Sequence, residues 1–244
     1  PMTAVPDLSE AKSHVSGKGR DFRVAPTPED HDNVTKEVLK PLACWLMGDF
    51  RFHFGSSLVR WDALDDFQAL DRLRHRHPGT RLCLFGHADP IGNDSNNKVL
   101  SGRRAQSVYA VLTRQTDLWE DLYSSPAGSD QWTEGDLANM LLFIGYIDTV
   151  DGSPVDEAIL RRFQDDFGVP QSGQFDKETR RVLFRAYMDL ICVDAPPGDV
   201  TPMPYELDPA NHFLGGGENS EGIGDYQGCS EFNPRMIFSA REWN

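Results

Sequence analysis

The sequence has no apolar run that approaches the roughly 20 residues of a membrane-spanning helix, so no membrane span is expected in this chain. Basic residues are also few, because 24 Lys and Arg stand against 38 Asp and Glu and give a formal net charge of −14. Such a chain repels polyanions at long range, which excludes nucleic acid as a partner. An anionic ligand must therefore be held by a few placed groups.

Cysteines are few and widely spaced. The positions of Cys44, Cys83, Cys192 and Cys229 contain no Cys-x-x-Cys pair, which argues against a zinc knuckle or a thioredoxin-type site. One or two disulfides and four free thiols are all compatible with this spacing. The first forty residues lack the apolar stretch of a secretion signal, so no signal peptide is expected in this sequence.

The remaining composition is that of an ordinary globular protein, with 39% hydrophobic and 25% charged residues. A length of 244 residues allows one or two domains, at roughly 100 to 200 residues each. Residues 1–40 carry Pro, Ser, Gly and alternating charge without periodicity, which predicts an irregular N-terminal arm.

Strand and helix patterns alternate between residues 49 and 113. Residues 49–54 read D-F-R-F-H-F, the period of two that is typical of a half-buried strand. Apolar residues recur at every third position over 61–75 and predict a helix with one buried stripe. A short apolar strand at 81–85, a polar loop and a second helix at 97–113 follow. This order predicts a βαβα layout with helices packed on a small sheet.

The second half of the chain is predicted to be mainly helical. Three short amphipathic segments at 134–143, 156–167 and 177–190 are separated by glycine-containing turns, which indicates a compact three-helix unit. Residues 195–228 are rich in Pro and Gly and are expected to be irregular. A strand pattern reappears at 235–238.

The most specific motif lies between Gly86 and Val108, where ten positions fall in register without a gap. The pattern resembles the OmpA-like family of peptidoglycan-binding domains, in which Gly-His-Thr-Asp is followed by fixed Gly, Asn, Leu-Ser, Arg-Ala and Val positions. The family's threonine is Ala88 in this sequence. The matching residues are Gly86, His87, Asp89, Gly92, Asn97, Leu100, Ser101, Arg104, Ala105 and Val108.

The resemblance implies a pocket for diaminopimelate, a residue of the peptidoglycan stem peptide. By analogy with the family, Asp89 would accept from the ligand ammonium, and Arg104 would form a bidentate pair with its carboxylate. Asn97 would brace the loop or touch the ligand with its amide. Further contacts are expected from the amides of the loop and helix start and from the final strand; the residues concerned are Gly92, Asn93, Asp94 and Arg235.

A second segment, Leu137 to Met188, resembles the small three-helix peptidoglycan-binding-domain-1 family. Between Asp151-Gly152 and Phe163-Gln164 this chain is about two residues shorter than the family pattern and lacks its middle glycine. The apolar members of the pattern are equally explained as helix core. The shared positions are Gly145, Tyr146, Asp151, Gly152, Phe163, Gln164, Gly168, Pro170, Gly173, Asp176, Thr179 and Leu183.

An OmpA-like domain closes its sheet with one more strand, and no strand pattern follows the second helix. We therefore expect residues 235–238 to return beside 81–85, with the helical unit inserted between the two parts. The expected fold is α+β, with an OmpA-like domain at 41–125 plus 205–244, a helical insertion at 131–192 and the arm at 1–40.

Together these resemblances predict a non-catalytic peptidoglycan-binding module of the periplasm or cell envelope, or a secreted one, that anchors a larger envelope or secretion assembly. Neither a metal nor a cofactor is expected. One alternative is an interaction scaffold of an injection or secretion apparatus with a non-binding pocket; another is an accessory domain of a cell-wall hydrolase. The sequence has no Gly-x-Ser-x-Gly elbow and no His-Glu-x-x-His motif, so the chain is not expected to be an enzyme.

Overall fold

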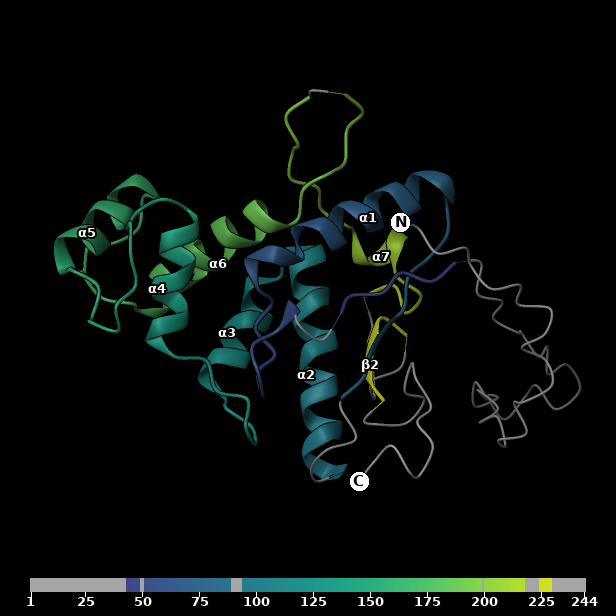
Figure 1. Cartoon of the computed structure of the whole chain (residues 1–244), viewed down its shortest axis with the longest axis horizontal. Coiled ribbons are helices and arrows are strands. Elements are labelled where there is room, and N and C mark those ends of the chain that lie inside the picture. The colour runs from purple at the N-terminus through teal and green to yellow at the C-terminus, as the bar shows by residue number, and fades with distance from the viewer. Residues whose placement is uncertain (1–42, 49–50, 89–93, 199, 218–223, 230–244) are drawn as a thin grey trace, which may run out of the picture. The chain divides into compact units, whose positions relative to one another are not determined.

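The computed structural model describes residues 43–48, 51–88, 94–198, 200–217 and 224–229, all of which belong to one compact unit (Figure 1). The predicted α+β class is confirmed, with helices around a two-stranded sheet. No helix within these ranges is both long enough and apolar enough to cross a membrane. The helices are η3, a 3-10 turn (Trp61–Ala63), α1 (Leu64–Arg76), α2 (Asp94–Thr113), α3 (Thr116–Ser124), α4 (Glu134–Phe143), α5 (Glu157–Asp166), α6 (Lys177–Ile191) and α7 (Pro209–His212).

The sheet joins distant parts of the chain. Strand β1 (Leu84–Gly86) pairs in parallel with β2 (Tyr226–Gly228), and Leu84 lies opposite Tyr226. The expectation that 195–228 is irregular is therefore wrong at β2 and at the short helix α7. This three-residue strand is too short for an apolar pattern that could be recognised in the sequence, and only its hydrogen bonds to β1 identify it as a strand. The strand expected at 235–238 lies outside the described residues.

The strand expected at 49–54 is reduced, in its described part, to one antiparallel bridge between Phe52 and Val59. The chain reverses at Gly55, whose φ of +68° favours glycine. The amide of Ser56 closes this turn by donating to the carbonyl of His53 at 3.0 Å. Because the reversal follows Phe52 so closely, no longer ladder forms here, and Phe54 is fully exposed.

Two helices differ from expectation. Helix α2 begins at Asp94, three residues before the predicted start at 97. Helix α3 is not among the predicted elements, and its buried face is formed by Trp119 and Leu122.

The hydrophobic core runs without a break from the sheet to the helical segments. Helix α2 packs on β1, β2 and α3, and α6 packs on α3 and α4 (Figure 1). Trp119 is fully buried where these layers meet, with its ring 5.6 Å from Phe184 of α6 and 5.2 Å from Trp132. The boundaries proposed for an inserted domain stay a prediction.

All four cysteines are free thiols, so the alternative without disulfides holds in this structure. Cys192 is buried, Cys83 and Cys229 are half-buried, and Cys44 is exposed.

Candidate functional site

Helix α2 carries most of the OmpA-like motif. It packs on the sheet so closely that the two glycines facing it, Gly86 and Gly228, leave no room for a side chain. A Cβ at Gly86 would overlap the carbonyl group of Ser101, and a Cβ at Gly228 would lie 2.5 Å from the amide nitrogen of Gly102. Ser101 has no exposed surface. Gly86 and Ser101 thus fix the depth of α2 against the sheet, and this sets the position of Arg104, about one turn further along.

Arg104 is the best-defined member of the predicted site. Only 6% of its surface is exposed, and its Nε donates to the carbonyl oxygen of Ser56 at 3.0 Å. The guanidinium carbon also lies 4.9 Å from the ring centroid of Phe52, within the range of a cation–π contact. The hairpin at 52–59 therefore orients this side chain. In the sequence, the alternating pattern around Phe52 indicates that this ring could pack inward, toward a residue such as Arg104. The hydrogen bond to Ser56 uses a backbone carbonyl, which every residue has, so no sequence pattern predicts it.

Asn97 lies on the same face of α2, seven residues before Arg104, and is 7% exposed. The backbone of Asp94 forms the start of the helix, where amide groups can face an anion. The structure thus brings Asn97, Arg104 and the Asp94 backbone onto one helix. The predicted positions Asp89, Gly92, Asn93 and Arg235 lie outside the described residues.

A buried polar network lies next to Arg104. The adjacent Arg103 pairs through its Nε with Asp130, whose side chain has no exposed surface. The carboxylate of Asp130 also accepts from the amide and the hydroxyl of Ser57, at 2.7 and 2.6 Å. The indole N–H of Trp132 in turn donates to the Ser57 hydroxyl at 3.1 Å. This network fixes the backbone at Ser57 and so places the neighbouring carbonyl that holds Arg104.

The residues shared with the three-helix family form the internal frame of that unit. Gln164 has no exposed surface, and its amide nitrogen donates to Ser172 Oγ at 2.9 Å and to Thr179 Oγ1 at 2.7 Å. Its amide oxygen accepts from the backbone of Gly173 at 2.8 Å. These bonds hold the loop between α5 and α6 closed. The prediction that the apolar residues of this segment form helix core is confirmed, because Leu160, Phe163 and Leu183 are buried and Val182 is partly buried against the core.

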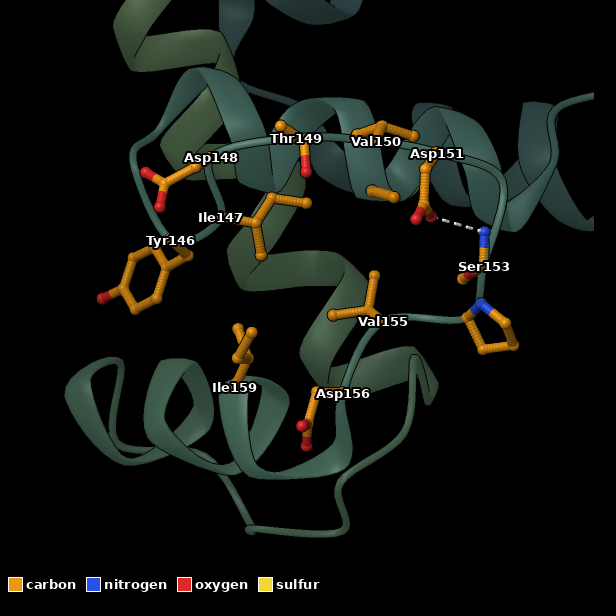
Figure 2. A pocket seen from close by; sticks show the side chains of 12 residues that line it. Tyr146, Ile147, Asp148, Thr149, Val150, Asp151, Ser153, Val155, Asp156 and Ile159 are labelled. Atoms are coloured by element: carbon orange, nitrogen blue, oxygen red, sulfur yellow. Dashed lines mark hydrogen bonds between the residues drawn. The ribbon is translucent and has the colours of Figure 1, made fainter.

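A hollow of about 290 Å³ lies between the loop at 146–153 and the start of α5 (Figure 2). Ile147, Val155 and Ile159 line its apolar part. Asp151 accepts from the amide of Ser153 at 2.9 Å, and this hydrogen bond lowers the pKa of the Asp151 carboxyl below its usual value. The wall at 153–159 falls in the part of the chain that is shorter than the family pattern.

Asp156 also lines this hollow and caps α5 by accepting from the amide of Ala158 at 2.7 Å. Both Asp151 and Asp156 therefore serve the local fold. Across the described ranges, no three His, Cys, Asp or Glu side chains are arranged to hold a metal ion.

Comparison with known proteins supports the first of the two resemblances. Residues 51–127 match the model of the OmpA family. The chain is similar to outer membrane porin F of Pseudomonas fluorescens, with 36% identity over 66 residues, 27% of this chain and 20% of the relative. It is also similar to outer membrane porin F of Pseudomonas aeruginosa, with 34% identity over 67 residues, 28% of this chain and 19% of the relative.

The chain thus spans about one fifth of the length of these relatives. No solved structure matches it significantly. The matched segment contains the hairpin at 52–59, β1, α2 with Arg104, and α3. The chain therefore carries an OmpA-family domain at residues 51–127.

Proposed function

We propose that the OmpA-family domain is a non-catalytic peptidoglycan-binding module that holds the diaminopimelate of a stem peptide between Asp89 and Arg104. The observation that carries the proposal is the placement of Arg104. It occupies the motif position of the family's ligand-binding arginine, and Ser56 and Phe52 hold its guanidinium in one orientation. A preorganised arginine loses less side-chain entropy when a carboxylate binds.

The chemistry of such a pocket follows from the geometry of the arginine. In such a pocket the guanidinium of Arg104 would form a bidentate contact with the ligand carboxylate, while its Nε keeps the hydrogen bond to Ser56. Backbone amides at the start of α2 add favourable potential for the same carboxylate. Charge-assisted hydrogen bonds contribute roughly 1.5–3 kcal/mol each, so two or three of them, less ordering costs, correspond to a dissociation constant in the micromolar range.

The acidic composition fits a local pocket of this kind. A net charge of −14 gives no bulk attraction to an anionic wall, so affinity has to come from groups matched to a zwitterion. Binding should therefore weaken little as salt rises, since the largely buried Arg104 is screened less than surface charges are. The names of the relatives, outer membrane porin F in both cases, support a place in the cell envelope. We propose in addition that the module anchors a larger envelope or secretion assembly there.

The test is a comparison of diaminopimelate-type and lysine-type muropeptides by calorimetry. Lysine lacks the carboxylate that Arg104 is proposed to bind, so only the diaminopimelate form should bind with micromolar affinity. Arg104→Ala should reduce that affinity about 10- to 100-fold, which corresponds to the loss of one or two charge-assisted bonds. The exposed arginine variant Arg185→Ala serves as the matched control and should bind normally.

Because Arg104 also holds the hairpin, thermal unfolding must show that Arg104→Ala is folded at the assay temperature. Arg104→Lys keeps the charge but cannot form a bidentate pair, and it should lose about tenfold in affinity. Equal binding of both muropeptides, or unchanged binding by a folded Arg104→Ala, would contradict the proposal.

A second candidate is an interaction scaffold of a secretion or injection apparatus whose pocket binds no wall ligand. The low exposure of Arg104 and the use of its Nε by Ser56 favour it, because both features would also suit a purely structural arginine. In that case, the folded wild-type chain would bind neither muropeptide.

A further inference from the structure

Trp61 differs from the other three tryptophans that the structure describes. The indole N–H of Trp45 donates to the carbonyl of Asp66 at 2.8 Å, and the indoles of Trp119 and Trp132 donate inside the core at 3.1 Å. Trp61 is 48% exposed, and within the described ranges its N–H makes no hydrogen bond. A large aromatic side chain left half in solvent is a common feature of ligand and partner sites.

Trp61 lines a hollow of about 190 Å³, which we call the Trp61 pocket. Its floor is apolar, because Leu58, Met140 and Tyr187 are each no more than 4% exposed. The aromatic wall is a tilted pair of Trp61 and Phe143, with ring centroids 5.1 Å apart. Polar side chains complete the lining: His53, Arg60, Asp136 and Asn139.

The polar side chains at the pocket retain hydrogen-bonding atoms that have no partner among the residues the structure describes. The amide nitrogen of Asn139 donates to Gly135 at 2.9 Å, which leaves its amide oxygen without a partner among the described residues. One carboxylate oxygen of Asp136 accepts from both the amide and the hydroxyl of Thr133 in the helix cap, at 2.7 and 2.9 Å. The other carboxylate oxygen can accept from a ligand. Arg60 can donate through its terminal nitrogens, since its ion-pair contact with Asp62 is made by Nε at 3.5 Å.

We propose that the Trp61 pocket binds one pyranose ring of a neutral amino-sugar glycan. This inference rests on the proposed function, since it adds a contact for the glycan strand of the same polymer. The C–H face of a pyranose packs on an aromatic face, where its slightly positive hydrogens meet the negative π-cloud. Ring hydroxyl and acetamide groups would exchange hydrogen bonds with the planar groups of Asp136, Asn139 and Arg60.

Charge and size both favour this occupant. The pocket carries one carboxylate and one guanidinium, so it offers no net charge to select an ion and suits a neutral polar ligand. Its volume of about 190 Å³ is below the roughly 300–1,000 Å³ of sites for drug-sized ligands, which matches a single sugar ring.

The pocket also depends on both halves of the structure. His53, Leu58, Arg60 and Trp61 belong to the segment that matches the OmpA family, whereas Asp136, Asn139, Met140 and Phe143 come from α4. Tyr187 of α6 ties the two together by donating its hydroxyl to the carbonyl of Val59 at 3.3 Å. A glycan bound in the Trp61 pocket would contact α4, so the helical segment would take part in wall binding without using the separate hollow between residues 146 and 159.

The experiment is a titration of the full chain with chitotriose, a trimer of N-acetylglucosamine without a stem peptide, followed by calorimetry and tryptophan fluorescence. Chitotriose should bind and change the emission of Trp61. Trp61→Ala should weaken binding by about tenfold or more, whereas Trp61→Phe should keep part of the affinity. Phe54→Ala removes a fully exposed aromatic that does not line the pocket, and it should bind as the wild type does.

Arg104→Ala separates this inference from the proposed function. It should lose the preference for the diaminopimelate-type over the lysine-type muropeptide and keep chitotriose, whereas Trp61→Ala should lose chitotriose and keep that preference. Absence of chitotriose binding, or equal binding by wild type and Trp61→Ala, would overturn the glycan site even if muropeptide still bound. Binding of chitotriose together with equal affinity for the diaminopimelate-type and lysine-type muropeptides would instead overturn the proposed function alone.

Discussion

Gly86 lies so close to Ser101 that a Cβ at position 86 would stand 2.8 Å from the carbonyl carbon of Ser101 and nearer still to its oxygen. Both residues belong to the motif shared with the OmpA family. Their contact gives these two motif positions a structural role that does not depend on a ligand, because it determines how closely α2 packs on the sheet. Because Gly86 has no side chain, α2 can approach the sheet closely. This close approach sets the position of Arg104, near the middle of α2.

Gly86→Ala should therefore destabilise the fold. The new methyl group meets backbone atoms that cannot rotate away, and such overpacking costs roughly 1–3 kcal/mol or more. Gly102→Ala is the matched control on the same seam, since its Cβ would lie 3.9 Å from the nearest atoms, in Gly228. That helical substitution should be neutral or stabilise by up to about 1 kcal/mol. Urea unfolding midpoints measure both; equal midpoints for the two variants would contradict the close packing.

Asp130→Ala should be among the most damaging single changes at a polar residue. It leaves Arg103 and Ser57 without their shared buried acceptor, and breaking a buried ion pair from one side costs roughly 3–5 kcal/mol. The loss would be measured as the free energy of unfolding in urea. Because Ser57 is next to Ser56, the same variant should also loosen the hairpin around Arg104.

An exposed ion pair supplies the control for Asp130. Glu157 pairs with Arg161 on the surface of α5, with 63% of the Glu157 side chain exposed. Glu157→Gln should change the free energy of unfolding by less than about 1 kcal/mol. If both substitutions had similar small effects, the network at Asp130 would not be the structural anchor described above.

The pH dependence of stability should include a contribution from Asp176. Burial alone would raise the pKa of this carboxyl, but hydrogen bonds from Ser172 and Thr179 outweigh it and hold the pKa below its usual value. A depressed carboxyl pKa stabilises the fold above the unfolded pKa of about 3.9 and loses that stabilisation as pH falls through the folded pKa.

Asp176→Asn keeps a helix-capping side chain and removes the titration. At pH 7 the variant should be less stable than wild type by about 0.3–1 kcal/mol, the usual size of a charge interaction at a helix N-terminus. The difference should shrink below pH 4. A constant difference from pH 7 to pH 2.5, measured by urea unfolding, would show that the charge of Asp176 contributes nothing.

Thiol reactivity should separate one cysteine from the other three. Burial, with the nearby Asp225 and Cys229, raises the pKa of Cys83 to about 11. Burial also raises the pKa of Cys192 and that of Cys229. At pH 8 about one Cys83 thiol in a thousand is ionised, whereas an unperturbed thiol of pKa about 8.5 is ionised to roughly a quarter.

Labelling with Ellman's reagent at pH 8 should therefore give one fast thiol, the exposed Cys44, and three slow ones. All four should react quickly in 8 M urea. Cys44→Ser should remove the fast phase, and a fast phase that persisted in this variant would contradict the burial of the other thiols.

Local signals explain why the helices of the second half could be predicted closely. Segments 134–143, 156–167 and 177–190 were expected, and the observed helices are Glu134–Phe143, Glu157–Asp166 and Lys177–Ile191. Asp156 and Asp176 cap the latter two by accepting from amides two and three residues ahead. Helical periodicity and capping involve residues within one or two turns, so they can be read along the chain.

The sequence by itself determined the α+β class, the helical patterns and the motif that places Arg104 on α2. Tertiary structure decided what surrounds that arginine: the Ser56 carbonyl, the Phe52 ring and the network at Asp130. It also decided that Tyr226–Gly228 completes the sheet and that Trp61 meets α4 at a pocket. These relationships join residues far apart in sequence, often through backbone atoms common to every residue type, and chain folding alone brings such groups together.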